Sequence, residues 1–342
     1  MTSKSPSAFH LRAQAKLPEP EQCLAHLADH LREHDGELEE QAGVILVSLP
    51  DVRGRLWCEN GRLHVDADSS DAETAYFVRS WLDDVFRHLA GGQPAQIDWE
   101  ENWSLGHLPP SFSILKVEAL HNPIPQMMRV TLKCPDAARF DRADALHVQV
   151  LVNFSELAAT AGEARVPPTW RRYTVRSVDR IRNTIDIDVF LHGKGGPGAA
   201  WIGELGVGQL VGVAGPSGGG IGVADRLLIA GDETALPAIA RMMDLLPRHC
   251  HGELLIETHE VAAERLLPAL PAGFKVTWLA RDRHPGFALE NALIVALADP
   301  SEEPRFVWVA CEAAAASRIR KHVRAIAERD SLTHLIAGYW KR

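Results

Sequence analysis

The sequence predicts a chain of three parts: a small α+β domain, a closed antiparallel six-stranded β-barrel, and an α/β domain on a parallel sheet. Apolar residues adopt a period of two from Phe112 onward, and after Gly220 short apolar strands alternate with helical segments. At 342 residues the chain is also too long for one ordinary domain, since domains average about 150 residues. We expect the three domains at residues 1–105, 106–220 and 221–342.

The first part mixes helical and strand patterns. Apolar residues at helical spacing predict a helix from Glu21 to about Asp35, stopped at Gly36. Asn60-Gly61 between two alternating segments predicts a hairpin on a type I′ turn. The run S-D-A-E at 70–73 has the form of a capping box, so a second helix should begin there.

Three histidines of the first predicted helix, His26, His30 and His34, recur at i+4 spacing. They could form a metal site on one helix face. A solvated helix face is the alternative, which we prefer because no Asp or Cys ligand is evidently paired with them. We therefore predict no metal site.

Alternating apolar segments predict the six barrel strands. They are residues 112–119, 127–134, 145–152, 172–177, 184–191 and 209–214. Five further apolar segments, separated by helices, predict a parallel sheet covered on both faces. They are residues 226–230, 254–258, 275–280, 306–311 and 334–337. The glycine-rich stretch 215–220 between the two sets is a linker; a phosphate-cradling loop is the alternative, but no Lys-Ser/Thr follows as in a P-loop.

Composition excludes several classes of function. The net charge of -9 offers no basic footprint for nucleic acid. No apolar run is long enough for a membrane helix and the opening residues lack a signal-peptide core, so we expect a cytoplasmic protein. The five cysteines are scattered without a C-x-x-C pair, which argues against disulfides and iron–sulfur clusters. We expect a monomer.

The first chemical motif is R-R-Y-T-V-R at 171–176, at the start of a predicted barrel strand. It resembles the R-x-Y-[ST] flavin motif of the ferredoxin-reductase superfamily, and its longer form is typical of siderophore-interacting proteins. The resemblance implies that Tyr173 lies against the isoalloxazine, that Thr174 bonds the flavin edge and that arginine pairs with the pyrophosphate. An ordinary strand with exposed arginines is the alternative.

The second motif is the glycine-rich run from His192 to Trp201, H-G-K-G-G-P-G-A-A-W. Glycines permit close backbone approach, and a helix beginning near Pro197 would direct its free amides at a pyrophosphate. The stretch is similar to H-G-x-x-G-P-x-x-x-W of the same family. His192 could instead be a catalytic base, but a reductase that only moves electrons needs none, so we expect no catalytic side chain.

The third motif, G-D-E-T-A-L-P-A-I at 231–239, follows a predicted strand and opens a helix, a geometry that offers amides to a dinucleotide phosphate. It is close to a signature of the siderophore-interacting family. Two C-terminal runs also resemble that family: W-V-A-C-E-A at 308–313, where Cys311 replaces a family glycine, and the terminal G-Y-W-K-R. A βα turn without a ligand and a strand end packed by aromatics are the alternatives.

The resemblance covers about residues 110–342 and implies FAD, NADH or NADPH, and reduction of ferric siderophores to release Fe(II). A flavin reductase serving another protein and a siderophore-storage protein are the alternatives. Glu257 and its neighbours include no arginine for a 2′-phosphate, which favours NADH. The expected substrate-binding cations are Arg281, Arg283 and Lys341. The implied cofactor-binding residues are Arg171, Tyr173, Thr174, Val175, Arg176, His192, Gly193, Gly196, Pro197, Ala199, Ala200, Trp201, Gly231, Asp232, Glu233, Thr234, Ala235, Tyr339 and Trp340.

Overall fold

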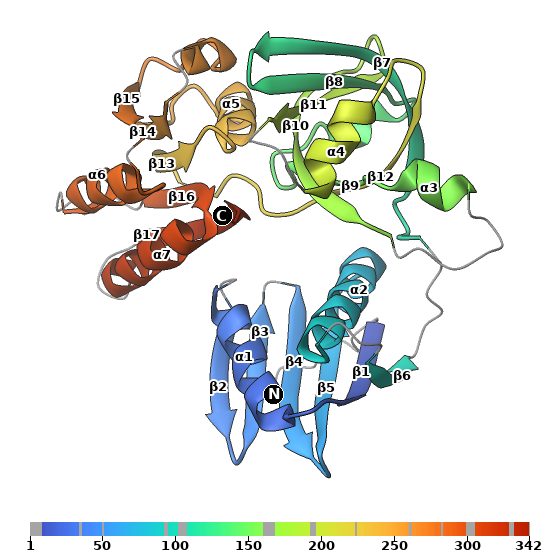
Figure 1. Ribbon diagram of the computed structural model, residues 1–342. Helices are drawn as coiled ribbons and strands as arrows, with labels where there is room; N and C mark the ends of the chain where they lie inside the picture. Colours follow the sequence, from blue (N-terminus) through green and yellow to red (C-terminus); the bar gives the residue numbers. More distant parts are fainter. Residues whose placement is uncertain are drawn as a thin grey trace, which may run out of the picture. The chain divides into compact units, whose positions relative to one another are not determined.

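A computed structural model describes most of the chain, and it divides into two compact units, Met1–Phe112 and Ser113–Arg342 (Figure 1). The second unit contains both the barrel and the parallel sheet. The described residues are 9–33, 36–49, 51–91, 95–101, 108–159, 168–191, 196–222, 224–259, 262–281, 283–298, 305–327 and 332–341.

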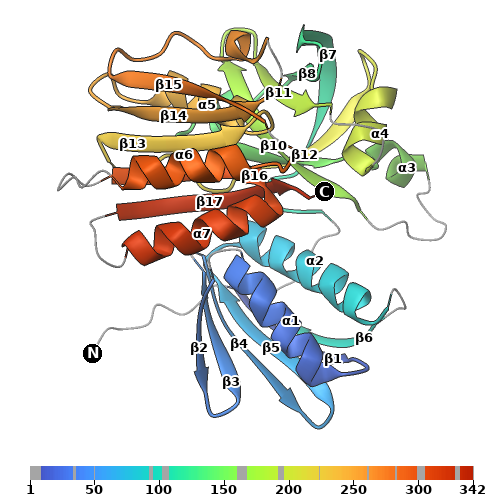
Figure 2. The same ribbon diagram turned by 60° about the vertical axis from the view of Figure 1, so that its left-hand side comes forward.

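The first unit is an antiparallel sheet in the order β2-β3-β4-β5-β1-β6, with α1 and α2 packed on one face (Figures 1 and 2). Leucines, valines and alanines alternate along the central strands and bury that face against the helices. The elements are β1 (Phe9–Lys16), α1 (Pro20–Glu33), β2 (Glu37–Gln41), β3 (Val44–Leu49), β4 (Val52–Glu59), β5 (Arg62–Ser69), α2 (Ala72–Leu89) and β6 (Gln96–Glu101).

Local predictions for this unit had mixed outcomes. The type I′ hairpin is confirmed, since Asn60 and Gly61 both have positive φ, 51° and 71°. The capping box is wrong: the N-cap of α2 is Asp71, whose carboxylate accepts the Thr74 amide at 2.8 Å. Glu73 cannot close such a box, because its carboxylate instead accepts the amide and hydroxyl of Ser111.

The barrel closes in the order β10-β11-β8-β7-β12-β9, all pairs antiparallel. Six strands lie at the predicted places, which confirms the barrel. Its elements are β7 (Ser113–Ile124), β8 (Met127–Lys133), η1 (Ala137–Phe140), β9 (His147–Leu151), α3 (Phe154–Ala159), β10 (Trp170–Asp179), β11 (Thr184–Phe190), α4 (Pro197–Glu204) and β12 (Leu210–Ser217).

The α/β part is a parallel sheet in the order β15-β14-β13-β16-β17, which also confirms the prediction. One apolar cluster packs α5 on one face and another packs α6 and α7 on the opposite face. The elements are β13 (Arg226–Asp232), α5 (Leu236–Leu245), β14 (His251–Thr258), η2 (Ala263–Leu266), β15 (Phe274–Ala280), α6 (Phe287–Leu297), β16 (Arg305–Glu312), α7 (Ala313–Ala327) and β17 (Leu332–Trp340).

Barrel and parallel sheet share a core. Ile124, Met127 and Leu146 of the barrel belong to the same buried cluster as α5. Arg176 of β10 donates to Asp244 of α5 at 2.6 Å, and Arg241 of α5 donates to Asp141 of the barrel at 2.9 Å. These contacts bring the flavin motif of β10 next to the α/β part.

Candidate functional site

On one side of β10, Tyr173 meets the N-terminal half of α4. The Tyr173 ring lies 5.7 Å from that of Trp201, tilted by 30°. A Cβ added to Gly198 would stand 2.6 Å from the Tyr173 hydroxyl oxygen, so glycine is what allows this approach. Burial raises the pKa of Tyr173 to about 12, which keeps the hydroxyl a hydrogen-bond donor.

The start of α4 suits an anion. Gly196 is the N-cap with φ 98°, Pro197 follows it, and no described side chain caps the helix. Amides of the first turn therefore point outward without a side-chain acceptor, as helix N-termini that bind phosphate do. The aromatic pair and the start of α4 fit a flavin dinucleotide. A hollow of about 500 Å³ lies on the side of α4 that faces α3, and Tyr173 is not among its lining residues.

The neighbouring residue on β10 faces the α/β part. Thr174 is 5% exposed and hydrogen-bonds Tyr339 of β17. The Tyr339 hydroxyl also lies 2.9 Å from Nε2 of His147. His147 lies on β9, where it is the strand partner of Thr174 on β10. Burial, and then the Arg172 guanidinium, lower the pKa of His147 to about 3, so its ring is neutral. Hydrogen bonds among the neutral side chains of Thr174, Tyr339 and His147 thus connect the barrel to the parallel sheet.

At the carboxyl end of β13, Gly231 permits close packing, because an added Cβ would lie 2.9 Å from the Ala310 carbonyl oxygen. Asp232 next to it is turned inward. One carboxylate oxygen accepts the amide of Thr234 at 2.9 Å, and the other accepts the indole N–H of Trp340 at 2.8 Å. The Asp232 carboxylate therefore fixes the turn and the C-terminal strand.

Three strand ends bring buried charges together. Arg281, which follows β15 and is 13% exposed, pairs with Glu233 and has its Nε 3.4 Å from Glu257 and an Nη 3.6 Å from Asp232. Glu257 also accepts the amides of Gly286 and Leu289 at the start of α6. Three carboxylates thus share one guanidinium at the edge where parallel sheets bind ligands.

Glu233 is the least satisfied member of this cluster. Burial raises its pKa to about 7; Arg281 opposes the rise, and the Asp232 and Glu257 carboxylates add to it. Its Oε1 is buried without a hydrogen-bond partner among the described residues. The nearest imidazole nitrogen, Nδ1 of His259, is 3.6 Å away.

The expected site residues fall into distinct places. Val175 is buried in the barrel core, Arg176 bonds Asp244, and Arg171 is exposed with a bond to the Trp170 carbonyl. Arg283 and Lys341 are exposed beyond the ends of β15 and β17. His192 and Gly193 lie outside the described residues.

Sequence reasoning missed His147 and did not select Arg172 or Gly198. Arg172 is the variable position of R-x-Y-T on β10, and Gly198 lies inside the second motif at the start of α4, so both stand within motifs that the sequence already marked. No local signal marks His147, which gains its importance only from the pairing of β9 with β10.

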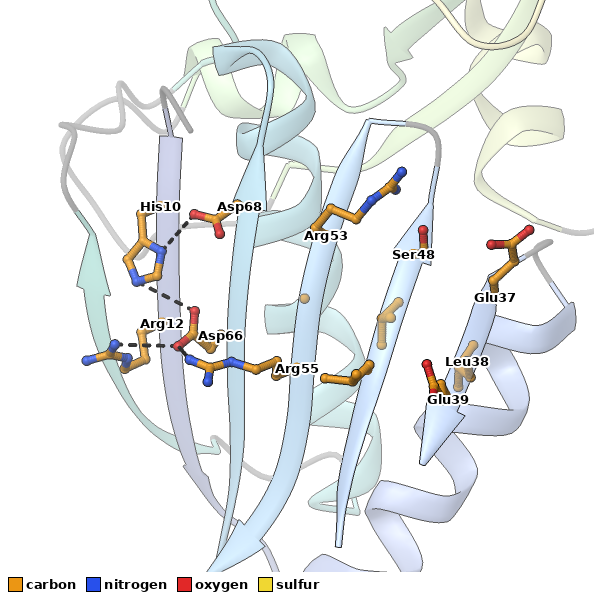
Figure 3. A pocket seen from close by; sticks show the side chains of 13 residues that line it. His10, Arg12, Glu37, Leu38, Glu39, Ser48, Arg53, Arg55, Asp66 and Asp68 are labelled. Carbon is orange, nitrogen blue, oxygen red and sulfur yellow. Dashed lines mark hydrogen bonds and ion pairs between the residues drawn. The ribbon is translucent and has the colours of Figure 1, made fainter. Parts of the chain in front are cut away.

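The first unit has its own hollow, about 780 Å³, on the sheet face opposite the helices (Figure 3). Asp66 on β5 accepts from Arg12 at 3.5 Å and from Arg55 at 2.5 Å, and His10 bonds Asp68 at 3.0 Å. These charges neutralise one another across strands, which leaves no evident preference for one ligand class.

Two of the three histidines considered as a metal site lie on α1. His30 stacks on Trp81 at 5.6 Å, and His26 is exposed. His34 lies outside the described residues. No helix of the described chain is long and apolar enough to cross a membrane.

The antiparallel barrel and the parallel five-stranded sheet each match a family profile. Residues 116–220 match the profile of the siderophore-interacting FAD-binding domain, and residues 224–342 match that of the siderophore-interacting proteins. The chain belongs to the siderophore-interacting protein family.

Solved structures agree. A siderophore utilization protein from T. fusca is 32% identical, with a TM-score of 0.54, over 68% of this chain and 93% of that protein. A siderophore-interacting protein from Acinetobacter baumannii, 23% identical, superposes with a TM-score of 0.56 over 67% of this chain and 90% of its own. The second likeness supports the fold alone.

Among characterised relatives, the chain is 29% identical to the ferric vibriobactin reductase of Vibrio cholerae over 168 residues, 46% of this chain and 62% of that protein. It is 27% identical to the ferric acinetobactin reductase of Acinetobacter baumannii over 179 residues, 51% of this chain and 61% of the relative. The chain therefore matches less than two thirds of the length of either reductase.

Proposed function

We propose that this protein is an FAD-dependent NAD(P)H:ferric-siderophore oxidoreductase, with its reductase core in residues 113–342. The observation that carries the proposal is the position of β10. Tyr173 contributes to the cradle at α4, while the adjacent Thr174 is bonded to Tyr339 of the parallel sheet. Consecutive residues thus link the flavin half and the nucleotide half of the site.

FAD suits such a site because it takes up a hydride from a nicotinamide and passes on electrons singly, as Fe(III) requires. The chain's own residues bind and orient. Tyr173 and Trp201 offer aromatic surface, Arg171 and Arg172 offer positive charge, and the start of α4 offers amides to the pyrophosphate. His147 stays neutral and holds the Tyr339 hydroxyl in place.

Gly231, Thr234 and Ala235 would approach the nicotinamide nucleotide at the βα turn. We favour NADH as the donor, because Glu233 and Glu257 occupy the edge where a 2′-phosphate would need a cation. The only described guanidinium inside this cluster, that of Arg281, is already shared among carboxylates.

The anionic iron chelate would meet exposed cations beside the flavin, for which Arg283 and Lys341 are our candidates. Arg281 was the third cation expected to bind substrate. Its role would be indirect, because its positive charge offsets the negative charge of the carboxylates that would repel the chelate. One electron from the flavin would reduce Fe(III) to Fe(II), which hard oxygen ligands bind less tightly, so the iron would then dissociate from the chelate.

The test is anaerobic reduction of the purified protein with NADH or NADPH, followed by ferric siderophores and a ferrous trap. Bleaching by nucleotide, then reoxidation with a stoichiometric ferrous signal, is the expected result. A protein that binds ferric chelate without reoxidation would instead be a storage protein, and one that reduces only a protein acceptor would be a flavin reductase. Either outcome would refute the proposal.

A further inference from the structure

The amino-terminal edge of the parallel sheet carries a second group of chemically reactive side chains. Asp225, His249 and Cys250 each present one ligand atom, and these atoms all lie within 4.8 Å of one another. No other set of three His, Cys, Asp or Glu side chains comes this close within the described part of the chain. The group lies at the strand starts, whereas Gly231 and Glu257 lie at the strand ends.

Backbone structure holds the three residues together. Arg226 at the start of β13 is aligned with His251 at the start of β14, so Asp225 and Cys250 are the residues immediately before an aligned pair. The His251 amide donates to the Asp225 carbonyl oxygen at 2.9 Å. On the other side, the Cys250 amide donates to the Pro247 carbonyl oxygen at 3.1 Å, closing the turn that presents His249.

The three donors are those of a transition-metal site. Carboxylate oxygen, imidazole nitrogen and thiolate sulfur all bind zinc-type ions, at about 2.0–2.3 Å. His249 Nε2 and Asp225 Oδ1 are already 3.0 Å apart, near the roughly 3.5 Å that such bond lengths give between tetrahedral ligands. The separations from the Cys250 sulfur are within 4.8 Å, and side-chain rotation can bring them to the same spacing.

Accessibility and charge are also suitable. The Asp225 and His249 side chains are 69% and 65% exposed, so an ion can reach them from solvent. Cys250 is buried, and burial, followed by the Asp225 carboxylate, raises the pKa of its thiol. The Asp225–His249 contact already holds two of the three donor atoms next to each other.

We propose that Asp225, His249 and Cys250 bind a divalent transition-metal ion of the zinc type, with water completing the coordination. On binding, the Cys250 S–H bond breaks, the metal–sulfur bond forms and one proton passes to solvent. The ion would join the starts of β13 and β14. The site is independent of the proposed redox chemistry, which uses the opposite edge of the sheet.

The test is a cobalt titration of the FAD-loaded protein after treatment with a chelator. Tetrahedral Co²⁺ shows ligand-field bands in the red, beyond the absorption of oxidised flavin, and a thiolate ligand adds a charge-transfer band. We expect one Co²⁺ per chain, release of about one proton and stoichiometric displacement by Zn²⁺. Absence of equimolar binding would overturn the proposal.

Cys250→Ser should abolish the charge-transfer band and weaken binding by about 100-fold or more, since even outer-shell partners are worth roughly 10–100-fold. Cys134→Ser, which changes another buried cysteine, should leave binding unchanged. His249→Ala alters an exposed side chain, so it tests the site even if the Cys250 variant fails to fold; at least tenfold weaker binding is expected. His322→Ala, another exposed histidine beside a carboxylate, is its control. Wild-type affinity in His249→Ala would refute the site.

Discussion

The two halves of the candidate redox site carry opposite charge. The barrel half presents Arg171, Arg172 and the uncapped start of α4 around an aromatic pair. The α/β half places three buried carboxylates around one guanidinium. A dianionic pyrophosphate is therefore attracted to the barrel, whereas a nucleotide approaching the parallel sheet must rely on backbone amides, since the Arg281 charge is already neutralised.

In the proposed reaction, this contrast would let the protein keep one cofactor and exchange another. FAD would stay bound through several contacts with the barrel half, and the nicotinamide donor would leave after each turnover. Arg281 holds the acidic cluster together, and the carboxylates of the cluster limit anion affinity. Variants in each half should separate these two effects.

The largest effect is expected from Arg281→Gln. Removing the guanidinium leaves Asp232, Glu233 and Glu257 as buried carboxylates without a counterion, and breaking such a pair costs about 3–5 kcal/mol. Urea unfolding should show this loss. Arg265→Gln, which alters an exposed arginine outside the cluster, should stay within about 0.5 kcal/mol of the wild type. Equal stability of the two variants would mean that the carboxylates are not charged in the fold.

In the barrel half, Gly198→Ala should lower FAD affinity at least about tenfold, which is roughly 1.4 kcal/mol. The added Cβ would stand 2.6 Å from the Tyr173 hydroxyl oxygen, so the ring must leave its place. Gly203→Ala lies in the same helix and meets no atom within 4 Å. It should therefore retain FAD, as measured by flavin fluorescence titration. Similar affinities in both variants would show that Tyr173 does not shape the flavin site.

The barrel and the parallel sheet were predictable because their signals are local. Alternating apolar and polar residues mark β8 and β11, whereas continuous apolar runs mark β13 and β16. The two patterns distinguish the antiparallel barrel from the parallel sheet. The βα turn after Gly231 was visible for the same reason. Its close packing against Ala310 explains why glycine stands there.

Other features depend on contacts between distant residues and could not be predicted. Arg281 meets Glu233 and Glu257 only because β13, β14 and β15 are neighbours, and the sequence showed three unrelated charges near strand ends. Strand β1 pairs with β5, and β6 pairs with β1, at one side of the first sheet. Neither segment had a recognised strand pattern in the sequence. Asp71, and not Ser70, caps α2, and Glu73 bonds the distant Ser111.

A smaller and pH-dependent effect is expected from Glu233→Gln. A carboxyl group whose pKa is raised on folding, here to about 7, contributes stability that is fully present below its unfolded pKa and is lost as pH rises through 7. Glutamine does not ionise. The variant should therefore gain in thermal midpoint relative to the wild type between pH 5 and pH 8. Glu264→Gln, at an exposed glutamate, should show no such trend; a parallel response would contradict the buried charge at Glu233.

The smallest effect is expected where the chain is cut most severely. The two compact units separate at Phe112 and Ser113, and each has its own buried core. All cradle residues, from Tyr173 to Trp201, and the whole acidic cluster belong to the second unit. A fragment of residues 113–342 should therefore retain FAD with unchanged stoichiometry and absorption spectrum, and Arg281→Gln should destabilise it as much as the full chain. Loss of flavin from a folded fragment would mean that the first unit completes the cofactor site, and the contrast between barrel and sheet would then describe only part of it.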